Sequence, residues 1–414
     1  MQSRNFVDLM FEKIFLIVIF FSAINFVNAQ NSVHQNLNDT LFFAQENFII
    51  AEDTAQTDSI KIVKKENFIK KLISGNLTWS LVAIPFASYQ PETNWGFGIT
   101  GVYYLKPKKV DGKIGSVTFT ATYTLNNQFT SKVTTIAYLD KNQKWLLYGT
   151  AGFNFFPDNF YGIGNQKKNL ESQPIKYTSN NFALNLQPQT YIKGSWLLGI
   201  STHFRWENAK PDSVKFEQIP LQKYSVYGFK EYFMFGFGGV VSYDTRDNLY
   251  YPAKGMFFKS ILTYYPKISE KSYQMGKIQS DFRHYIPIYK KLIFAYQFST
   301  EWNFADKRPF QMLSTIGGME LLRGIRQNVW RNDVMAVLQT ELRIPIWKIF
   351  KAAAFASIGD VYSLENWQWA TPKIGYGVGL RIQFNKSKSN LRIDVARQNF
   401  GNNFSWYVTV NEAF

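Results

Sequence analysis

Apolar and polar residues alternate along this chain over stretches of ten or more positions, and this alternation restricts the fold more than any other feature. It is clearest in three segments, 116–126, 196–207 and 374–384. In the first, Val, Phe, Ala, Tyr and Leu share one face and Ser, Thr and Asn share the other, as expected of a β-strand between two environments. A soluble sandwich also alternates, but its strands are about 5 or 6 residues long. Strands of about ten residues can cross a bilayer at a tilt, so the pattern predicts a transmembrane β-barrel.

The composition agrees with strands as the membrane-spanning elements. Hydrophobic residues make up 46% of the chain and aromatic residues 18%, yet the mean hydropathy is -0.21. After the N-terminal region, no apolar run reaches the roughly 20 residues that a transmembrane helix needs. The apolar residues are instead spread over every second position of many segments, which is typical of outer-membrane barrels.

The N-terminal region has the pattern of a secretory signal peptide. The apolar run 14–21 is followed by small and polar residues up to Ala29. We therefore predict a signal peptide at 1–29, with translation starting at Met1 or Met10, and a mature chain that begins at the next residue. The chain contains no Cys, so no disulfide framework or thiolate metal site is expected.

Sixteen strands are expected from the alternating runs and the turn residues between them, an even number as is usual in single-chain bacterial barrels. The expected ranges are 77–89, 95–106, 114–126, 128–139, 143–156, 177–192, 194–207, 229–244, 251–265, 272–286, 290–304, 331–345, 348–359, 373–384, 389–399 and 404–414. Connections after even-numbered strands are mostly short, whereas those after odd-numbered strands include the long segments 157–176, 208–228 and 305–330. Short periplasmic turns and long external loops explain this difference and place both barrel termini in the periplasm.

Aromatic residues are found near the ends of the expected strands. They include Trp145, Phe155, Phe156, Tyr161, Tyr250, Tyr251, Tyr264, Tyr265, Trp302, Trp330 and Trp406. Membrane barrels carry aromatic girdles at the two lipid–water interfaces. We therefore predict that these side chains form such girdles.

The most informative loop sequence is the segment 317–326, which reads Gly-Gly-Met-Glu-Leu-Leu-Arg-Gly-Ile-Arg. Its glycines allow a sharp fold, and Arg323 and Gly324 could place one guanidinium deep inside the barrel. The segment resembles the Arg-Gly loop of the BamA/TamA-type outer-membrane assembly barrels, also called bacterial surface antigen proteins. The segments 156–165 and 341–345 are also similar to parts of these proteins.

The resemblance covers the predicted barrel, residues 77–414, and implies a role in the insertion, assembly or translocation of outer-membrane proteins or lipids. The strand count makes the Arg323 loop the sixth external loop, between the eleventh and twelfth strands, which is the placement that this family uses. The resemblance also implies that the loop folds into the lumen and that Glu341 faces it. It also implies that the terminal Phe414 is the signal by which the assembly machinery recognises the barrel.

The segment 243–248 resembles the Asp-rich periplasmic turn of the same family. Its charged residues are Asp244, Arg246 and Asp247. A charged, capped hairpin turn accounts for these residues, so we predict a structural role for them rather than a binding role.

The chain departs from the family pattern in its N-terminal segment. Family members normally carry periplasmic POTRA domains of about 75 residues before the barrel, and the predicted periplasmic segment 30–76 is too short for one. Within it, the basic amphipathic stretch 64–73 is either a short helix, which lies at the periplasmic mouth or enters the lumen, or part of a mobile tail.

A second departure lies in the expected strand 348–359. The family has the pattern Phe-x-Asp-x-Gly there, and this chain has Phe355, Ser357 and Gly359. Ser357 thus occupies the position of the Asp that usually receives the loop arginine.

A guanidinium that enters a partly desolvated lumen still needs a partner, because an unpaired buried charge is costly. The alternation places several charged residues on the lumen side, namely Asp281, Arg283, Glu301, Glu341, Arg343, Arg392 and Asp394. We predict Glu341 as the partner of Arg323, since the resemblance also implies that this residue faces the loop.

Enzymatic and nucleic-acid functions are not indicated. The three His residues, His34, His203 and His284, are scattered, and neither metal-ligand spacing nor a Gly-x-Ser-x-Gly motif is present, so no catalytic residue, metal or cofactor is predicted. The net charge is +16, but the basic residues are dispersed in an exported chain. Attraction to lipopolysaccharide and anionic lipid headgroups explains the charge better than nucleic acid.

These observations predict a non-enzymatic, integral protein of a Gram-negative outer membrane that handles outer-membrane clients, with possible accessory periplasmic subunits. A weak seam between the first strand, 76–89, and the last, 404–414, would open laterally and offer unpaired edge groups to a client strand. Two alternatives remain: a passive porin-like channel plugged by the Arg323 loop, and a structural subunit of an envelope complex.

Overall fold

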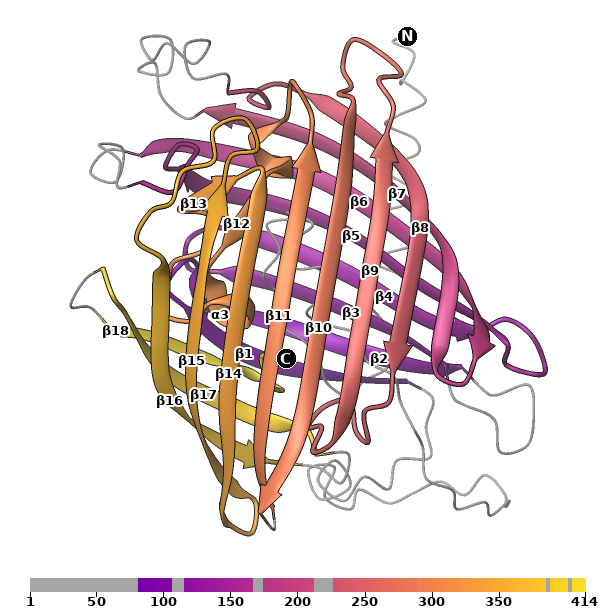
Figure 1. Cartoon of the computed structure of the whole chain (residues 1–414), viewed down its shortest axis with the longest axis vertical. Helices are drawn as coiled ribbons and strands as arrows, with labels where there is room; N and C mark the ends of the chain where they lie inside the picture. The colour runs from indigo at the N-terminus through magenta and orange to yellow at the C-terminus, as the bar shows by residue number, and fades with distance from the viewer. Residues whose placement is uncertain are drawn as a thin grey trace, which may run out of the picture.

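The described residues of the computed structural model form a closed antiparallel barrel of sixteen strands (Figure 1). These residues are 81–105, 115–166, 174–211, 226–289, 291–384, 388–400 and 404–414. The sixteen-stranded prediction is therefore confirmed. The predicted signal peptide, the predicted periplasmic segment and the first residues of the predicted barrel, 77–80, lie outside the described residues.

The barrel strands follow the chain in order. They are β1 Leu81–Gln90, β2 Asn94–Leu105, β3 Gly115–Thr124, β4 Phe129–Tyr138, β5 Trp145–Phe160, β6 Ile175–Lys193, β7 Trp196–Pro211, β8 Tyr232–Asp244, β9 Gly255–Tyr265, β10 Met275–Tyr289, β11 Leu292–Phe304, β14 Val334–Trp347, β15 Phe350–Tyr362, β16 Lys373–Gln383, β17 Asn390–Gln398 and β18 Phe404–Val410. Each pairs with its sequence neighbour, β11 pairs with β14, and β1 pairs with β18 to close the ring.

The two faces of the strands differ as the alternation predicts. On β7, Trp196 and Ile200 face outward and are 44% and 60% exposed. Arg205 and Glu207 face the lumen and are 1% and 0% exposed, and they form an ion pair of 2.5 Å. Apolar side chains can therefore meet lipid on the outside, while buried charges in the lumen are paired.

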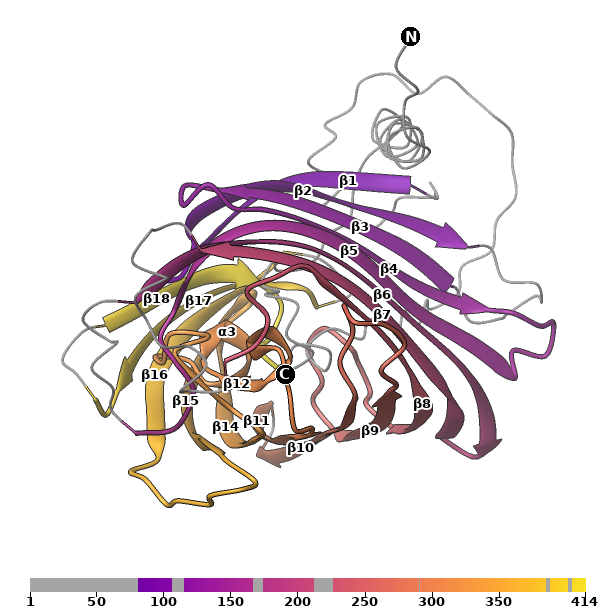
Figure 2. The same cartoon turned by 90° about the horizontal axis from the view of Figure 1, so that it is seen from above.

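The connection between β11 and β14, residues 305–333, folds into the barrel, and we call it the lumen loop. In Figure 2 its elements lie within the ring of strands, as does the C-terminus. These elements are η5 Phe310–Met312, β12 Ser314–Ile316, α3 Gly318–Leu321 and β13 Trp330–Asn332. The single strand predicted at 331–345 is thus two elements, because Trp330–Asn332 pairs with β12 inside the loop and the barrel strand begins at Val334.

The last strand is shorter than predicted. β18 ends at Val410, and the remaining residues turn into the lumen. Asn411 has a φ of 66°, a left-handed conformation that Asn tolerates better than most residues. The side chain of Phe414 is then buried against Tyr285 and Ala295 of β10 and β11.

The prediction that the strand-end aromatics form girdles is wrong for part of the set. Trp145 and Trp406 face outward and are 47% and 53% exposed, but Tyr265 and Trp330 are only 2% and 8% exposed. Successive side chains of a strand point to opposite faces. In a pair such as Tyr264 and Tyr265, only one ring can therefore face the lipid.

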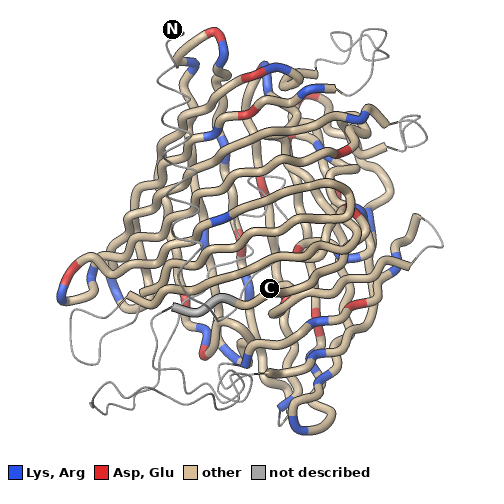
Figure 3. The backbone as a smooth tube through the Cα atoms, turned by 180° about the vertical axis from the view of Figure 1, so that it is seen from behind, with Lys and Arg blue, Asp and Glu red and all other residues tan. Residues whose placement is uncertain are grey.

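No helix within the described residues has the length and apolarity to span a membrane. Lys and Arg are distributed over many strands and turns instead of gathering on one face (Figure 3).

Candidate functional site

The tip of the lumen loop is shaped by glycines. Gly317 and Gly318 have φ values of 106° and 84°, a region that glycine occupies at little cost. A Cβ on Gly317 would lie 2.6 Å from the carbonyl oxygen of Arg326. The tip closes on itself at this point, so a side chain would not fit.

Apolar packing holds the tip against the barrel wall. Leu321, Leu322 and Ile325 of the loop form one buried cluster with residues of the wall. The wall residues are Met335 and Val337 of β14 and Val361 of β15. Burial of side chains of this size stabilises by about 1.5–3 kcal/mol each. The loop is therefore part of the packed interior.

Arg323 projects from this tip into a fully buried setting, with a side-chain exposure of 0%. Its two terminal nitrogens lie 2.8 Å from Glu341 of β14 and 2.8 Å from Asp394 of β17. Its guanidinium carbon also lies 3.5 Å from the centre of the Phe355 ring, which adds a cation–π contact. The structure thus brings the predicted pair of Arg323 and Glu341 together.

The other two contacts of Arg323 were not predicted. Asp394 was recognised as lumen-facing but not as a partner, and Phe355 was noted only as part of a motif. Alternation shows which face a side chain is on, but it does not show its height along the barrel axis. That height depends on the stagger between strands.

Arg323 belongs to a larger buried charge network that we call the lumen network. Glu341 also contacts Arg343 at 2.9 Å and Arg381 at 3.3 Å. Arg381 reaches Asp394 at 2.5 Å and Glu412 at 2.6 Å.

The lumen network continues to Arg392, which contacts Asp394 at 3.7 Å and Glu320 of the loop at 3.3 Å. Burial raises the pKa of the Glu320 carboxyl, and the charge of Arg392 opposes that rise. Counted together, four guanidiniums and four carboxylates make up the lumen network. Such a balance is what burial of charge requires.

Ser357 occupies the expected position on β15 and contacts the loop indirectly. Its hydroxyl donates to Oε1 of Gln339 at 3.4 Å, and the Gln339 amide donates to the backbone carbonyl of Glu320 at 2.7 Å. Asp394, on β17, supplies the second carboxylate for Arg323. Gly359, the third motif residue, packs closely against both β14 and the loop, because a Cβ there would lie 2.7 Å from Cγ2 of Val337 and 3.2 Å from Cδ1 of Leu322.

The C-terminal residue Phe414 contacts the lumen network through Arg343. Arg343 donates to the carbonyl oxygen of Phe414 at 2.7 Å and lies 5.8 Å from the centre of its ring. Phe414 therefore occupies the lumen in the folded protein. Its predicted role as a recognition signal concerns the chain before the barrel has folded, and it stays a prediction.

β1 and β18 are joined much more weakly than other neighbouring strands. Among the described residues, the one cross-strand pair between them is Tyr89 with Val408. In contrast, β1 pairs with β2 along its whole length. We call this junction the seam.

The lumen loop contacts both sides of the seam. The backbone N–H of Gly324 donates to the hydroxyl of Tyr407 on β18 at 2.9 Å. The N–H of Gln327 donates to Oε1 of Glu92, in the turn between β1 and β2, at 2.7 Å. Burial raises the pKa of the Glu92 carboxyl, and the bond from Gln327 opposes that rise. No pattern in the sequence pointed to Glu92, because it sits in an ordinary turn.

The turn between β8 and β9 is a capped hairpin. Arg246 donates from Nε and Nη2 to the two carboxylate oxygens of Asp244, at 3.0 and 2.7 Å. Asp247 accepts the backbone N–H groups of Ala253 and Lys254 at 2.8 and 3.1 Å. These contacts satisfy the polar groups of the turn itself, as a structural role requires.

Two of the histidines make hydrogen bonds with tyrosines. His203 lies 2.8 Å from the hydroxyl of Tyr265, and His284 lies 3.2 Å from that of Tyr296. No group of His, Asp and Glu with the arrangement of a metal site occurs in the part of the chain that the structure describes.

Comparison with known proteins agrees with this geometry. BamA from Haemophilus ducreyi lacking POTRA domains 1-3 matches with a TM-score of 0.56 at 11% identity, covering 80% of this chain and 70% of that one. CdiB from Acinetobacter baumannii matches with a TM-score of 0.53 at 11% identity, covering 80% and 59%. CdiB from Escherichia coli matches with a TM-score of 0.53 at 9% identity, covering 81% and 63%. At such identities, the likeness is one of fold.

The search of curated protein sequences gave no match. The family model of the Omp85 superfamily domain, however, matches residues 109–414. This match covers nearly the whole barrel, including the lumen loop and the lumen network. The chain therefore belongs to the Omp85 superfamily and is an integral β-barrel protein of the outer membrane.

Proposed function

We propose that this protein inserts or translocates outer-membrane clients, and that client strands pair at the seam between β1 and β18. The observation that supports this most strongly is the single pair, Tyr89 with Val408, that joins the two strands in the described chain. Unpaired N–H and C=O groups on a strand edge accept hydrogen bonds from an added strand. A barrel with one weak junction can offer such an edge without unfolding.

The proposed function also depends on the orientation of the barrel in the membrane. Both barrel termini face the periplasm, where unfolded clients arrive, and the protein acts without catalytic turnover. Its partners are client proteins, accessory periplasmic subunits and the surrounding lipid and lipopolysaccharide, which the net charge of +16 attracts. The resemblance of fold to BamA and CdiB supports this assignment.

A passive channel is the second candidate, because the lumen loop lies where a plug would lie. Ion flow would require the loop to leave a site where Arg323, Glu341 and Asp394 are all fully buried. Displacing paired buried charges is costly. We therefore expect low conductance in the resting protein.

One experiment separates the two functions. The full-length protein is reconstituted in proteoliposomes, a urea-unfolded outer-membrane barrel is added, and client folding and ion conductance are measured in the same preparation. We expect faster client folding than in protein-free liposomes, with little steady conductance. High conductance without any acceleration of client folding would support the channel instead.

The contact between Gln327 and Glu92 gives a further prediction. Glu92→Ala removes the acceptor on the β1 side of the seam and leaves the Gln327 N–H unpaired, which costs about 1–3 kcal/mol in the closed state. We expect brief opening events to become more frequent in planar-bilayer recordings. Glu92→Gln is the matched control, because its amide oxygen can still accept the hydrogen bond. If both variants open equally often, the lost hydrogen bond is not the cause.

A further inference from the structure

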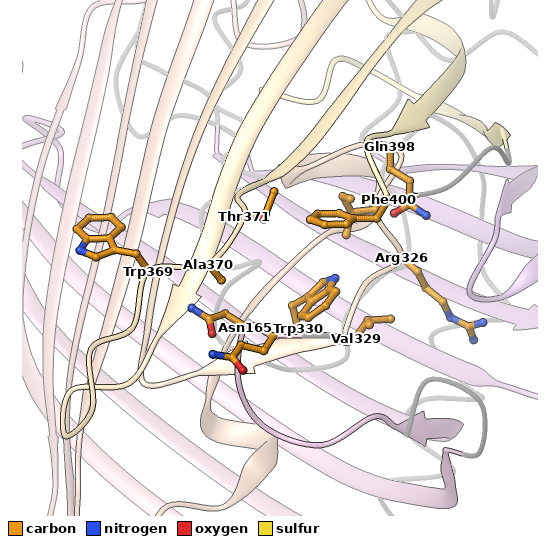
Figure 4. A pocket seen from close by; sticks show the side chains of 11 residues that line it. Asn165, Arg326, Val329, Trp330, Trp369, Ala370, Thr371, Gln398 and Phe400 are labelled. Atoms are coloured by element: carbon orange, nitrogen blue, oxygen red, sulfur yellow. The ribbon is translucent and has the colours of Figure 1, made fainter. Parts of the chain in front are cut away.

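A cavity of about 740 Å³ lies beside the lumen loop, at the end of the barrel where that loop enters. Its lining comes from four connections and strand ends that are distant in sequence. The lining residues are Asn165, Gln166, Ile325, Arg326, Val329, Trp330, Trp369, Ala370, Thr371, Gln398 and Phe400 (Figure 4). The volume is in the range of sites that hold small molecules.

Hydrogen bonds between loops fix the shape of this cavity. The side-chain amide of Asn165 donates to the carbonyl oxygen of Gln368 at 2.8 Å, and that of Gln166 donates to the Gln368 side chain at 2.9 Å. The ammonium group of Lys373 donates to the carbonyl oxygen of Asn165 at 2.5 Å. Two loops about 200 residues apart are therefore held together before any ligand binds, and such preorganisation lowers the entropic cost of binding.

One wall of the cavity is aromatic. The rings of Trp330 and Phe400 have centroids 6.4 Å apart and an interplanar angle of 41°. The Lys373 ammonium lies 4.3 Å from the Trp330 ring centre and 5.9 Å from that of Phe400, and Phe400 remains 37% exposed. This wall therefore presents an apolar surface in which Trp330 is buried and Phe400 is accessible to a ligand.

The polar part of the lining consists of amides, a hydroxyl and one cation. Gln398, Asn165 and Gln166 supply the amides and Thr371 the hydroxyl, whereas the guanidinium of Arg326 lies 5.7 Å from the Tyr161 ring centre and turns away from the other lining side chains (Figure 4). None of the lining residues is an Asp or a Glu. An amide group both donates and accepts hydrogen bonds, so it matches a ligand rich in hydroxyl groups.

We propose that this cavity binds a saccharide. The C–H face of a sugar ring packs on the Phe400 and Trp330 wall, while its hydroxyls bond to Gln398 and to the free oxygens of the amides. An extended peptide would need a strand edge or a long groove, whereas this site is a cup of fixed shape.

Binding is tested with the purified full-length protein on an array of neutral and uronic-acid-containing oligosaccharides, followed by calorimetry on the best glycan. We expect saturable binding that falls roughly tenfold in Gln398→Ala and in Phe400→Ala. Trp347→Ala is the matched control, because Trp347 is an aromatic residue that is 61% exposed and lies outside the cavity.

Each variant is first checked for heat-dependent mobility on SDS gels, which shows that its barrel has closed. The proposal is overturned if no glycan on the array is retained above background. It is equally overturned if a retained glycan binds the folded Gln398→Ala and Phe400→Ala variants as tightly as the original protein. Neither outcome bears on client insertion, which is measured separately.

Discussion

Replacing Arg323 by alanine is expected to release the lumen loop from the barrel wall while the strand ladder stays intact. The guanidinium is fully buried between Glu341 and Asp394, so its removal leaves the lumen network with one uncompensated negative charge. Breaking a buried pair in this way costs about 3–5 kcal/mol. We expect protease cleavage within the loop and a large loss of client insertion in proteoliposomes.

Glu341→Ala should also release the loop, since it removes the carboxylate that pairs with Arg323, and it additionally removes a partner of Arg343 and Arg381. The loss in the double variant should be clearly smaller than the sum of the two single losses, because the double variant restores the charge balance and the two residues share an ion pair. Lys307→Ala, which removes an exposed cation from the same loop, is the control and should behave like the original protein. Strictly additive losses in the double variant would show that Arg323 and Glu341 act independently.

Locking the seam with a disulfide is expected to abolish client insertion. Tyr89 and Val408 are cross-strand partners, and Cα atoms of antiparallel partners lie about 4.5–5.5 Å apart, within the range that a disulfide can bridge. The chain has no cysteine of its own, so the pair Tyr89→Cys and Val408→Cys forms the one available bridge. Client folding should stop on oxidation and return after reduction.

The matched control places the bridge in a junction that need not open. Ala87 and Phe97 are partners on β1 and β2, and the pair Ala87→Cys and Phe97→Cys should leave client insertion unchanged in both redox states. If the oxidised seam variant still inserts clients at the original rate, lateral opening between β1 and β18 is not part of the mechanism.

Much of the barrel could be predicted from the sequence, because the alternation of side chains reports directly on the two faces of each strand. β7, β10 and β16 lie within a few residues of their expected ranges. The position of Glu341 in the lumen follows from the same periodicity. These features depend on local sequence alone.

The parts that could not be predicted depend on contacts between distant residues. Asp394 meets Arg323 across 71 positions, and Glu92 meets Gln327 across 235. Such pairs are set by barrel closure and strand stagger, which no single segment encodes. For the inward turn after Val410, the sequence contains a single indication. Residue 411 is an Asn, a residue type that tolerates a left-handed backbone.

The position of the lumen network along the chain determines when it can form during folding. All of its members lie between residues 320 and 414, and its longest ion pair, Glu320 with Arg392, spans 72 positions. The seam, in contrast, joins residues near opposite ends of the barrel sequence. Contacts that close short loops form before those that close long ones. The C-terminal part of the barrel can therefore form the lumen network first. The pairing of β1 with β18 then comes last.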